Sequence, residues 1–301
     1  MHPIFVDLSN VVMMNPLVET HSDEQDQVLV KASLNGDRKA LDKLVRIHQP
    51  FIYNVAWKMA FEPDDALDLT QEVLIKVITK LSQFNFKSQF RTWLYRIVVN
   101  EFLQTKRRKG ESKFTTLEDH GARLDAVPGT DLTVEEEIEL KELTKEVQFR
   151  CLSGMLMCLT REQRLIYILG ETFEVDHNIG SEIFEITRQN FRVKLHRARK
   201  ELHNFMDNKC GLVNPSNPCR CSKKAKHFHN NGFLTEDKQM FNVGYREKIA
   251  DYAELHHKSV ADTVEDIHTK LFRNHPAKDN FDTETIIEEI LSDHDLMKHF
   301  L

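Results

Sequence analysis

The chain has 301 residues, of which 41% are hydrophobic and 29% charged, and its formal net charge is −6. This length suffices for a buried core and favours two or more domains. No stretch approaches the ~20 apolar residues of a membrane span, and no basic flank precedes the first apolar residues, so we expect neither a membrane segment nor a secretory signal. Only 10 Gly and 8 Pro occur, which predicts an all-α protein with few tight hairpins.

The N-terminal part is predicted to contain an extension and a helical bundle. Residues 1–24 are expected to be disordered, and residues 25–110 show apolar residues at helical spacing. The segment Asn35–Asp37 predicts a turn, and Glu62–Asp65 predicts the start of a new helix. One face of that helix carries an apolar stripe, formed by Ala66, Leu69, Val73 and Val77.

The opposite face of the same helix is acidic and polar. Its side chains are Asp65, Asp68, Gln71 and Glu72. Periodicity alone allows two interpretations, a solvated face or a docking surface for a basic partner.

A segment rich in aromatic and basic residues follows between residues 87 and 109. It holds seven Lys or Arg against one acid, Glu101. Cations follow phosphates, and aromatic faces stack on unpaired bases. The predicted nucleic-acid contacts are therefore Arg91, Trp93, Arg96, Asn100, Lys106, Arg107 and Arg108. Tyr95 and Phe102 are further candidates for stacking, while a core position is an equally good interpretation of Trp93.

Residues 111–134 are predicted to form an acidic, flexible linker because they combine Gly and Pro with polar residues and lack apolar periodicity. Residues 135–206 are predicted to be helical again, with Thr160 and Thr187 as N-caps. A short helix, a tight turn and a basic helix are the layout of a helix-turn-helix motif. In the basic helix a buried stripe is expected at Phe191, Leu195, Ala198 and Leu202. The residues expected to read base edges are Arg188, Gln189, Arg192 and His196.

The last parts of the chain are a cysteine-rich segment over residues 207–234 and an acidic helical tail over residues 235–301. Thiolates at Cys210, Cys219 and Cys221 could bind zinc or copper. Their spacing is not that of a zinc ribbon, so a redox role and a proline-pinned loop with reduced thiols stay open. No other cofactor is expected.

Three of these segments resemble signatures of one family. Asp65–Val73 resembles the Asp-x-x-Asp-x-x-Gln-Glu-Val signature of region two in bacterial RNA polymerase sigma factors of the extracytoplasmic-function (ECF) type. Phe90–Asn100 resembles their promoter-melting segment, and Leu195–Lys200 resembles the end of their region four. Three departures stand out. Phe191 replaces a smaller apolar residue, and Val193 replaces Ser or another polar residue. Ile179–Ser181 replaces the usual Glu-Ile-Ala, and Ser181 is expected to keep a small residue at the helix crossing.

The resemblance implies a non-catalytic cytoplasmic protein that binds core RNA polymerase through its acidic helix and directs it to promoter DNA at a restricted gene set. It also implies an anti-sigma factor as a candidate partner. Two alternatives stay open at this point. One is a helix-turn-helix regulator that does not associate with polymerase, and the other is a metal-sensing or redox-sensing DNA-binding protein.

Overall fold

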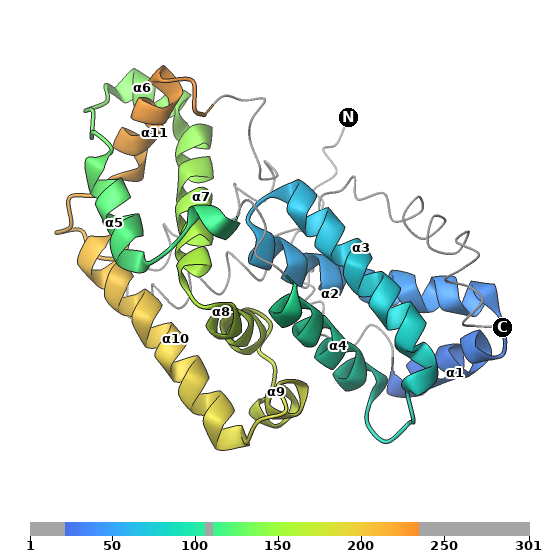
Figure 1. The fold of residues 1–301 in the computed structure, drawn as a ribbon. Helices are drawn as coiled ribbons and strands as arrows, with labels where there is room; N and C mark the ends of the chain where they lie inside the picture. Colours follow the sequence, from blue (N-terminus) through green and yellow to red (C-terminus); the bar gives the residue numbers. More distant parts are fainter. Residues whose placement is uncertain (1–21, 106–110, 235–301) are drawn as a thin grey trace, which may run out of the picture.

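The structure, a computed structural model, describes residues 22–105 and 111–234, and these residues form two helical units that pack against each other (Figure 1). The described residues contain no β-strand, which confirms the all-α prediction. The first unit consists of α1 (Asp23–Leu34), α2 (Arg38–Ala60), α3 (Pro63–Lys80), the 3-10 turn Leu81–Gln83 and α4 (Phe90–Gln104). The second consists of the 3-10 turn Glu111–Lys113, α5 (Leu117–Ala126), α6 (Val134–Glu139), α7 (Lys141–Cys158), α8 (Arg161–Tyr167), the π-helical turn Ile168–Thr172, α9 (His177–Ile183), α10 (Arg188–Lys209) and α11 (Cys221–Asn230).

The first unit is a bundle in which α3 packs along α2. Gly36 has φ of +89° in the turn between α1 and α2, and the Asp37 side chain then accepts a hydrogen bond from the Lys39 amide at 2.9 Å. The predicted turn is therefore confirmed, and its left-handed residue is a glycine. The predicted apolar stripe of α3 is also confirmed, because Ala66, Leu69, Val73 and Val77 are all buried.

Two carboxylates of α1 connect that helix to the rest of the bundle. The N-cap residue of α4, Gln89, makes no side-chain cap, and the amide of Phe90 donates instead to Asp23 Oδ1 at 2.8 Å. The fully buried Asp26 lies 2.9 Å from His48 Nε2 and 3.8 Å from Arg91 Nε. The start of α4 is thus positioned by a helix about 65 residues earlier in the chain.

The predicted linker differs from the structure, because it contains an ordered helix. Thr116 caps α5 by accepting a hydrogen bond from the Asp119 amide at 3.0 Å. The buried face of α5 is formed by His120 and Gly121, and it packs against α7 and the side chain of Phe205 on α10. Burial lowers the pKa of His120 to about 4. A histidine and a glycine give no apolar periodicity, which explains why the sequence pattern did not reveal this helix.

The cysteine-rich segment also contains a helix that its turn-rich sequence did not predict. After the end of α10 the chain turns and forms α11, which packs on α7 and buries Leu143, Val147 and Ala225 together. The buried ammonium of Lys224 donates hydrogen bonds to the carbonyl oxygens of Leu124 and Val127 at the C-terminal end of α5. A cation bound to the last carbonyls of a helix stabilises that end. The segment therefore holds α5 in place.

The two units share one continuous hydrophobic core. Arg164 of α8 is fully buried where the two units meet. Its Nη1 donates to the Met59 carbonyl of α2 at 2.8 Å and to Glu111 Oε1 at 3.0 Å. Its other nitrogens donate to the carbonyls of Leu156, Met157 and Leu159. One guanidinium therefore ties together α2, the turn at Glu111 and the end of α7.

Candidate nucleic-acid interface

The basic helix α10 has the two faces that its sequence predicts. Thr187 caps its start by accepting from the Asn190 amide at 3.2 Å, as expected. Its buried residues are Phe191, Leu195, Ala198, Leu202 and Met206. Arg188, Gln189, Arg192 and His196 are all exposed. These four side chains lie at the N-terminal end of the helix, where a helix-turn-helix contacts base edges.

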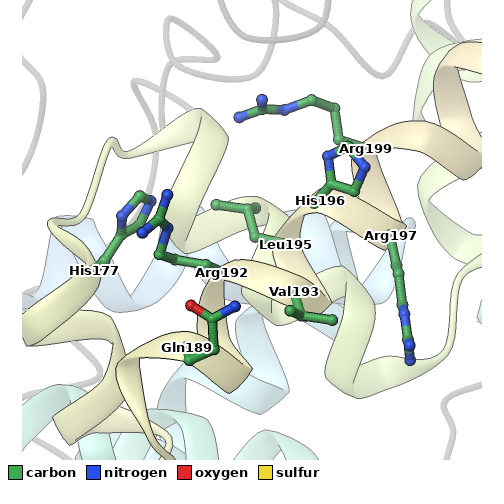
Figure 2. A pocket seen from close by; sticks show the side chains of 8 residues that line it. All are labelled: His177, Gln189, Arg192, Val193, Leu195, His196, Arg197 and Arg199. Carbon is green, nitrogen blue, oxygen red and sulfur yellow. The ribbon is translucent and has the colours of Figure 1, made fainter.

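A hollow of about 420 Å³ lies along this exposed face, and Figure 2 shows the residues that line it. It contains the expected Gln189, Arg192 and His196, together with Val193 and Leu195. It also contains three residues outside the four expected to read base edges, which are His177, Arg197 and Arg199. Arg199 forms an ion pair with Glu171 across the turn before α9. His177 comes from the preceding helix, and only the crossing of α9 and α10 brings it to this surface.

Two of the departures from the family pattern in this motif, at Gly180 and Phe191, compensate each other. A Cβ atom on Gly180 would lie 2.5 Å from the ring of Phe191, so the two helices meet there with no room for a side chain on α9. We expected Ser181 to be the small residue at this crossing, but its hydroxyl instead donates to the Asn178 carbonyl of its own helix. The large Phe191 thus occupies the space that the glycine leaves.

Replacing Gly180 with alanine is expected to lower the free energy of unfolding by about 1–3 kcal/mol, because the added methyl group overpacks the crossing. The second change Phe191→Leu should restore part of that loss, since it removes the ring that the methyl group meets. Urea unfolding of the wild type, both single variants and the double variant measures the coupling. Strictly additive effects of the two changes would contradict this packing.

The aromatic residues of α4 lie mostly in the core. Tyr95 stacks on Phe51 with ring centroids 3.9 Å apart, and Phe102 is fully buried. The prediction that these two rings are available to bases is therefore wrong. They point inward because α4 packs against α2 and α3 in the bundle. Trp93 is half-buried, and its ring centroid lies 5.5 Å from the centroids of Phe84 and of Phe90. One part of its indole therefore stays accessible.

The polar residues of α4 are in different environments. Asn100 is exposed. Arg91 is half-buried near Asp26, and Arg96 Nη1 lies 3.4 Å from Glu185 Oε1 in the loop before α10. The helix α4 thus contacts the helix-turn-helix unit through α8 and α9 (Figure 1). Lys106, Arg107 and Arg108 lie outside the described residues.

The acidic face of α3 is present as predicted, with Asp68 exposed and Asp65, Gln71 and Glu72 half-buried. All four side chains lie opposite or beside the buried stripe of this helix. Pro63 is the first helical residue, and Asp64 and Asp65 lie in the first turn, where negative charge is favourable.

The three cysteines of the extension lie close to a fourth one. Cys210 and Cys219 are paired through their backbones, and Cys221 begins α11. If deprotonated, all three would raise the pKa of the half-buried Cys151 of α7, because their negative charges lie near its thiol. Burial raises the pKa of Cys210, Cys219 and Cys221. In the part of the chain that the structure describes, no three His, Cys, Asp or Glu side chains are arranged to hold a metal ion. Zinc or copper binding here stays a prediction.

Among the described helices, none has the length and apolar character needed to cross a membrane.

A comparison with protein families gives one match, to Sigma-70 region 2, over residues 44–111. This range begins within α2 and includes the acidic face of α3 and the whole of α4.

Curated relatives extend the similarity beyond that region. The chain is 29% identical over 175 residues to the ECF RNA polymerase sigma factor SigE of Mycolicibacterium smegmatis, which covers 57% of this chain and 64% of the relative. It is 39% identical over 79 residues to the RNA polymerase sigma-H factor of Pseudomonas aeruginosa, covering 26% of this chain and 41% of the relative. It is 27% identical over 169 residues to the sigma factor YlaC of Bacillus subtilis, covering 56% of this chain and 93% of the relative.

A solved structure of CnrH in complex with the cytosolic domain of CnrY has a TM-score of 0.43 and 18% identity, and covers 61% of this chain and 97% of that one. The family match contains two of the three motifs named above, and the longer alignments are to proteins named as sigma factors. Residues 44–111 of this chain thus match Sigma-70 region 2, and more than half of the chain is similar to proteins named as ECF RNA polymerase sigma factors.

Proposed function

We propose that this protein binds core RNA polymerase and directs it to a restricted set of promoters, where transcription then starts. One observation supports this most strongly. A region 2 segment with an acidic helix face and a helix-turn-helix with an exposed basic face occur in one chain. A regulator that never associates with polymerase would need only the second of these.

In this proposal the protein works by binding, without a catalytic step of its own, and acts in the cytoplasm. The acidic face of α3 contacts a basic polymerase surface, where charge complementarity speeds association and fixes orientation. The accessible part of Trp93 with Asn100 faces unpaired bases, and α10 reads the upstream element. The three predicted basic residues 106–108 add phosphate contacts, and an anti-sigma factor remains a candidate partner.

The direct test is transcription in vitro with purified core polymerase, the full chain and a genomic DNA library. Transcripts that start at a discrete set of promoters and need both proteins would support the proposal. Binding of the chain to DNA sites without any polymerase-dependent transcript would favour the regulator instead.

Reversing the charge of Asp65 and Asp68 to lysine is expected to weaken the complex with core polymerase by at least about tenfold, because attraction becomes repulsion at the contact. The fold should persist, since the buried stripe of α3 is unchanged. Pull-down with core polymerase and circular dichroism measure the two effects. Glu118→Lys, an exposed acid on α5, is the matched control and should bind normally. Normal binding by the double variant would refute the docking surface.

Arg192 and Lys200 are both exposed on α10, and replacing them should affect different properties of DNA binding. Arg192→Ala is expected to relax base preference at one position, worth about 1–3 kcal/mol, because an arginine can bond two acceptors of a guanine. Lys200→Ala should weaken binding to all sequences and reduce the salt dependence, as loss of a phosphate contact does. Selection from random DNA and titrations at several salt concentrations distinguish the two. An unchanged sequence preference in Arg192→Ala would rule out its base contact.

A further inference from the structure

The turn between α10 and α11 brings two cysteines together. The backbones of Cys210 and Cys219 form an isolated parallel bridge. Paired backbones of this kind lie about 4.8 Å apart, and the side chains of a directly paired couple stand on the same face. A disulfide needs Cα atoms within about 4.4–6.8 Å. The two thiols are therefore neighbours at a distance that permits a bond.

The backbone around Gly211 approaches the Cys219–Arg220 segment closely, and this approach requires a glycine at position 211. A Cβ atom on Gly211 would collide with the carbonyl oxygen of Cys219 and with the guanidinium of Arg220. Any other residue at position 211 would therefore push Cys219 away from Cys210. This requirement gives the glycine of the Cys-Gly-Leu-Val segment a structural reason.

The turn keeps this shape without help from the cysteine side chains. Asn217 Nδ2 donates to the carbonyls of Asp207 at 2.8 Å and Cys210 at 3.2 Å. The Arg220 guanidinium donates to the carbonyls of Pro215 at 2.7 Å and Cys219 at 3.0 Å. Because amide and guanidinium groups hold the backbone, both thiols remain available for chemistry, and both are free in the structure.

No other two cysteines of the described residues have their backbones paired in this way. Cys151 and Cys158 lie seven residues apart on α7, which separates their Cα atoms by about 10 Å along the axis. Cys221 starts α11, and Cys151 Sγ lies 3.8 Å from His120 Nε2 in the interface with α5. Within residues 22–105 and 111–234 no group is arranged for a metal ion.

We propose that Cys210 and Cys219 are a reversible dithiol, oxidised by small-molecule disulfides to a bond that joins the end of α10 to the start of α11. The thiolate of one cysteine attacks the small disulfide, forms a mixed disulfide and releases one thiol. The thiolate of the other cysteine then attacks the protein sulfur of that mixed disulfide and releases the second thiol. Two electrons and two protons leave the protein, and the small disulfide is reduced to two thiols.

Several charged groups lie near the pair. Burial raises the pKa of both thiols. Near Cys219, Lys224, Arg220 and Lys209 lower the pKa, whereas Asp125 raises it. The thiolate is the reacting species in each of the two steps. The choice of partner is set by the backbone pairing and does not change with pH.

Peptide mapping of the full chain tests the pair directly. The reduced protein is freed of reductant, incubated with oxidised glutathione at mildly alkaline pH, alkylated and digested with trypsin. Trypsin cuts after Lys209 and Arg220, so residues 210–220 form one peptide with both cysteines, and Cys221 is on the next. We expect this peptide to resist alkylation, to be lighter than the reduced peptide by two hydrogen atoms and to carry no glutathione.

Two variants sharpen the test. Cys219→Ser should lose the internal bond and accumulate glutathione on Cys210, whereas the matched control Cys221→Ser should still form the bond. Linkage of the 210–220 peptide to Cys221 or Cys151 in the wild type would overturn the proposal. So would a glutathione adduct that persists on a single cysteine, or stoichiometric metal that protects these thiols in the purified chain. The mapping does not depend on polymerase or DNA binding, so its outcome is separate from that of the proposed function.

Discussion

Replacing Arg164 with alanine is expected to lower the free energy of unfolding by about 3–5 kcal/mol, because it leaves a buried carboxylate without one of its partners. Glu111, which is 1% exposed, loses the guanidinium at 3.0 Å. The carbonyl of Met59 also loses its bond at 2.8 Å, and that bond joins the two units. Urea unfolding followed by circular dichroism measures the loss.

The surface pair Arg46–Asp42 on α2 provides the matched control, because both side chains are partly exposed at a separation of 2.9 Å. Arg46→Ala should change stability by less than about 1 kcal/mol. The loss of stability in Arg164→Lys should lie between those of Arg164→Ala and Arg46→Ala. An ammonium keeps the charge but cannot donate to carbonyls on three sides. A loss in Arg164→Ala no larger than that in Arg46→Ala would show that this guanidinium does not hold the units together.

Lys58 is expected to make stability rise with pH between about pH 7 and pH 10.5. Its ammonium is buried at the junction of the units, over the ring of Phe173 at 5.4 Å, and burial lowers its pKa from 10.5 to about 7. Within this pH range the unfolded chain binds a proton at Lys58 that the folded chain does not bind. The free energy of unfolding should then increase by about 1.4 kcal/mol per pH unit from this group, whereas below pH 7 the full penalty of burying the charge remains.

Lys58→Met removes this contribution and should be more stable than the wild type at pH 6, with the difference shrinking towards pH 10. Comparison of the two curves cancels the titration of all other groups that the change does not perturb. The exposed Lys80 on α3 supplies the control, and Lys80→Met should leave the pH dependence unchanged. Parallel curves for the wild type and Lys58→Met would contradict a neutral buried amine.

Local patterns predicted much of this fold, because caps and apolar stripes depend on neighbours within one helix. Thr160 and Thr187 cap the helices that their sequence context indicated. The buried stripes of α3 and α10 followed from helical spacing in the same way. These features are set by hydrogen bonds and hydrophobic burial over three or four residues, which a sequence displays directly.

What the sequence did not reveal depends on contacts between distant segments. The burial of Arg164 requires carbonyls from residues that lie up to 105 positions away. His177 reaches the basic face only through the crossing of α9 and α10, and that crossing is set by Gly180 against Phe191. Tyr95 could be expected on either side of α4 until the position of Phe51 was known. In each case the environment of the residue is set by a contacting residue that lies far away in the sequence.

The hydrogen bonds from Lys224 to the end of α5 have a consequence for how this chain opens. Residues 117–126 and 221–230 are about 100 positions apart, yet Lys224 links the two helices directly and both pack on α7. They should therefore exchange their amide hydrogens as one cooperative unit, at a shared opening free energy. A protease cut in the turn before Cys221 would separate α11 from α10 and weaken protection in α5 as well. The stability of the segment between α4 and α10 would then depend on a helix near the end of the described residues.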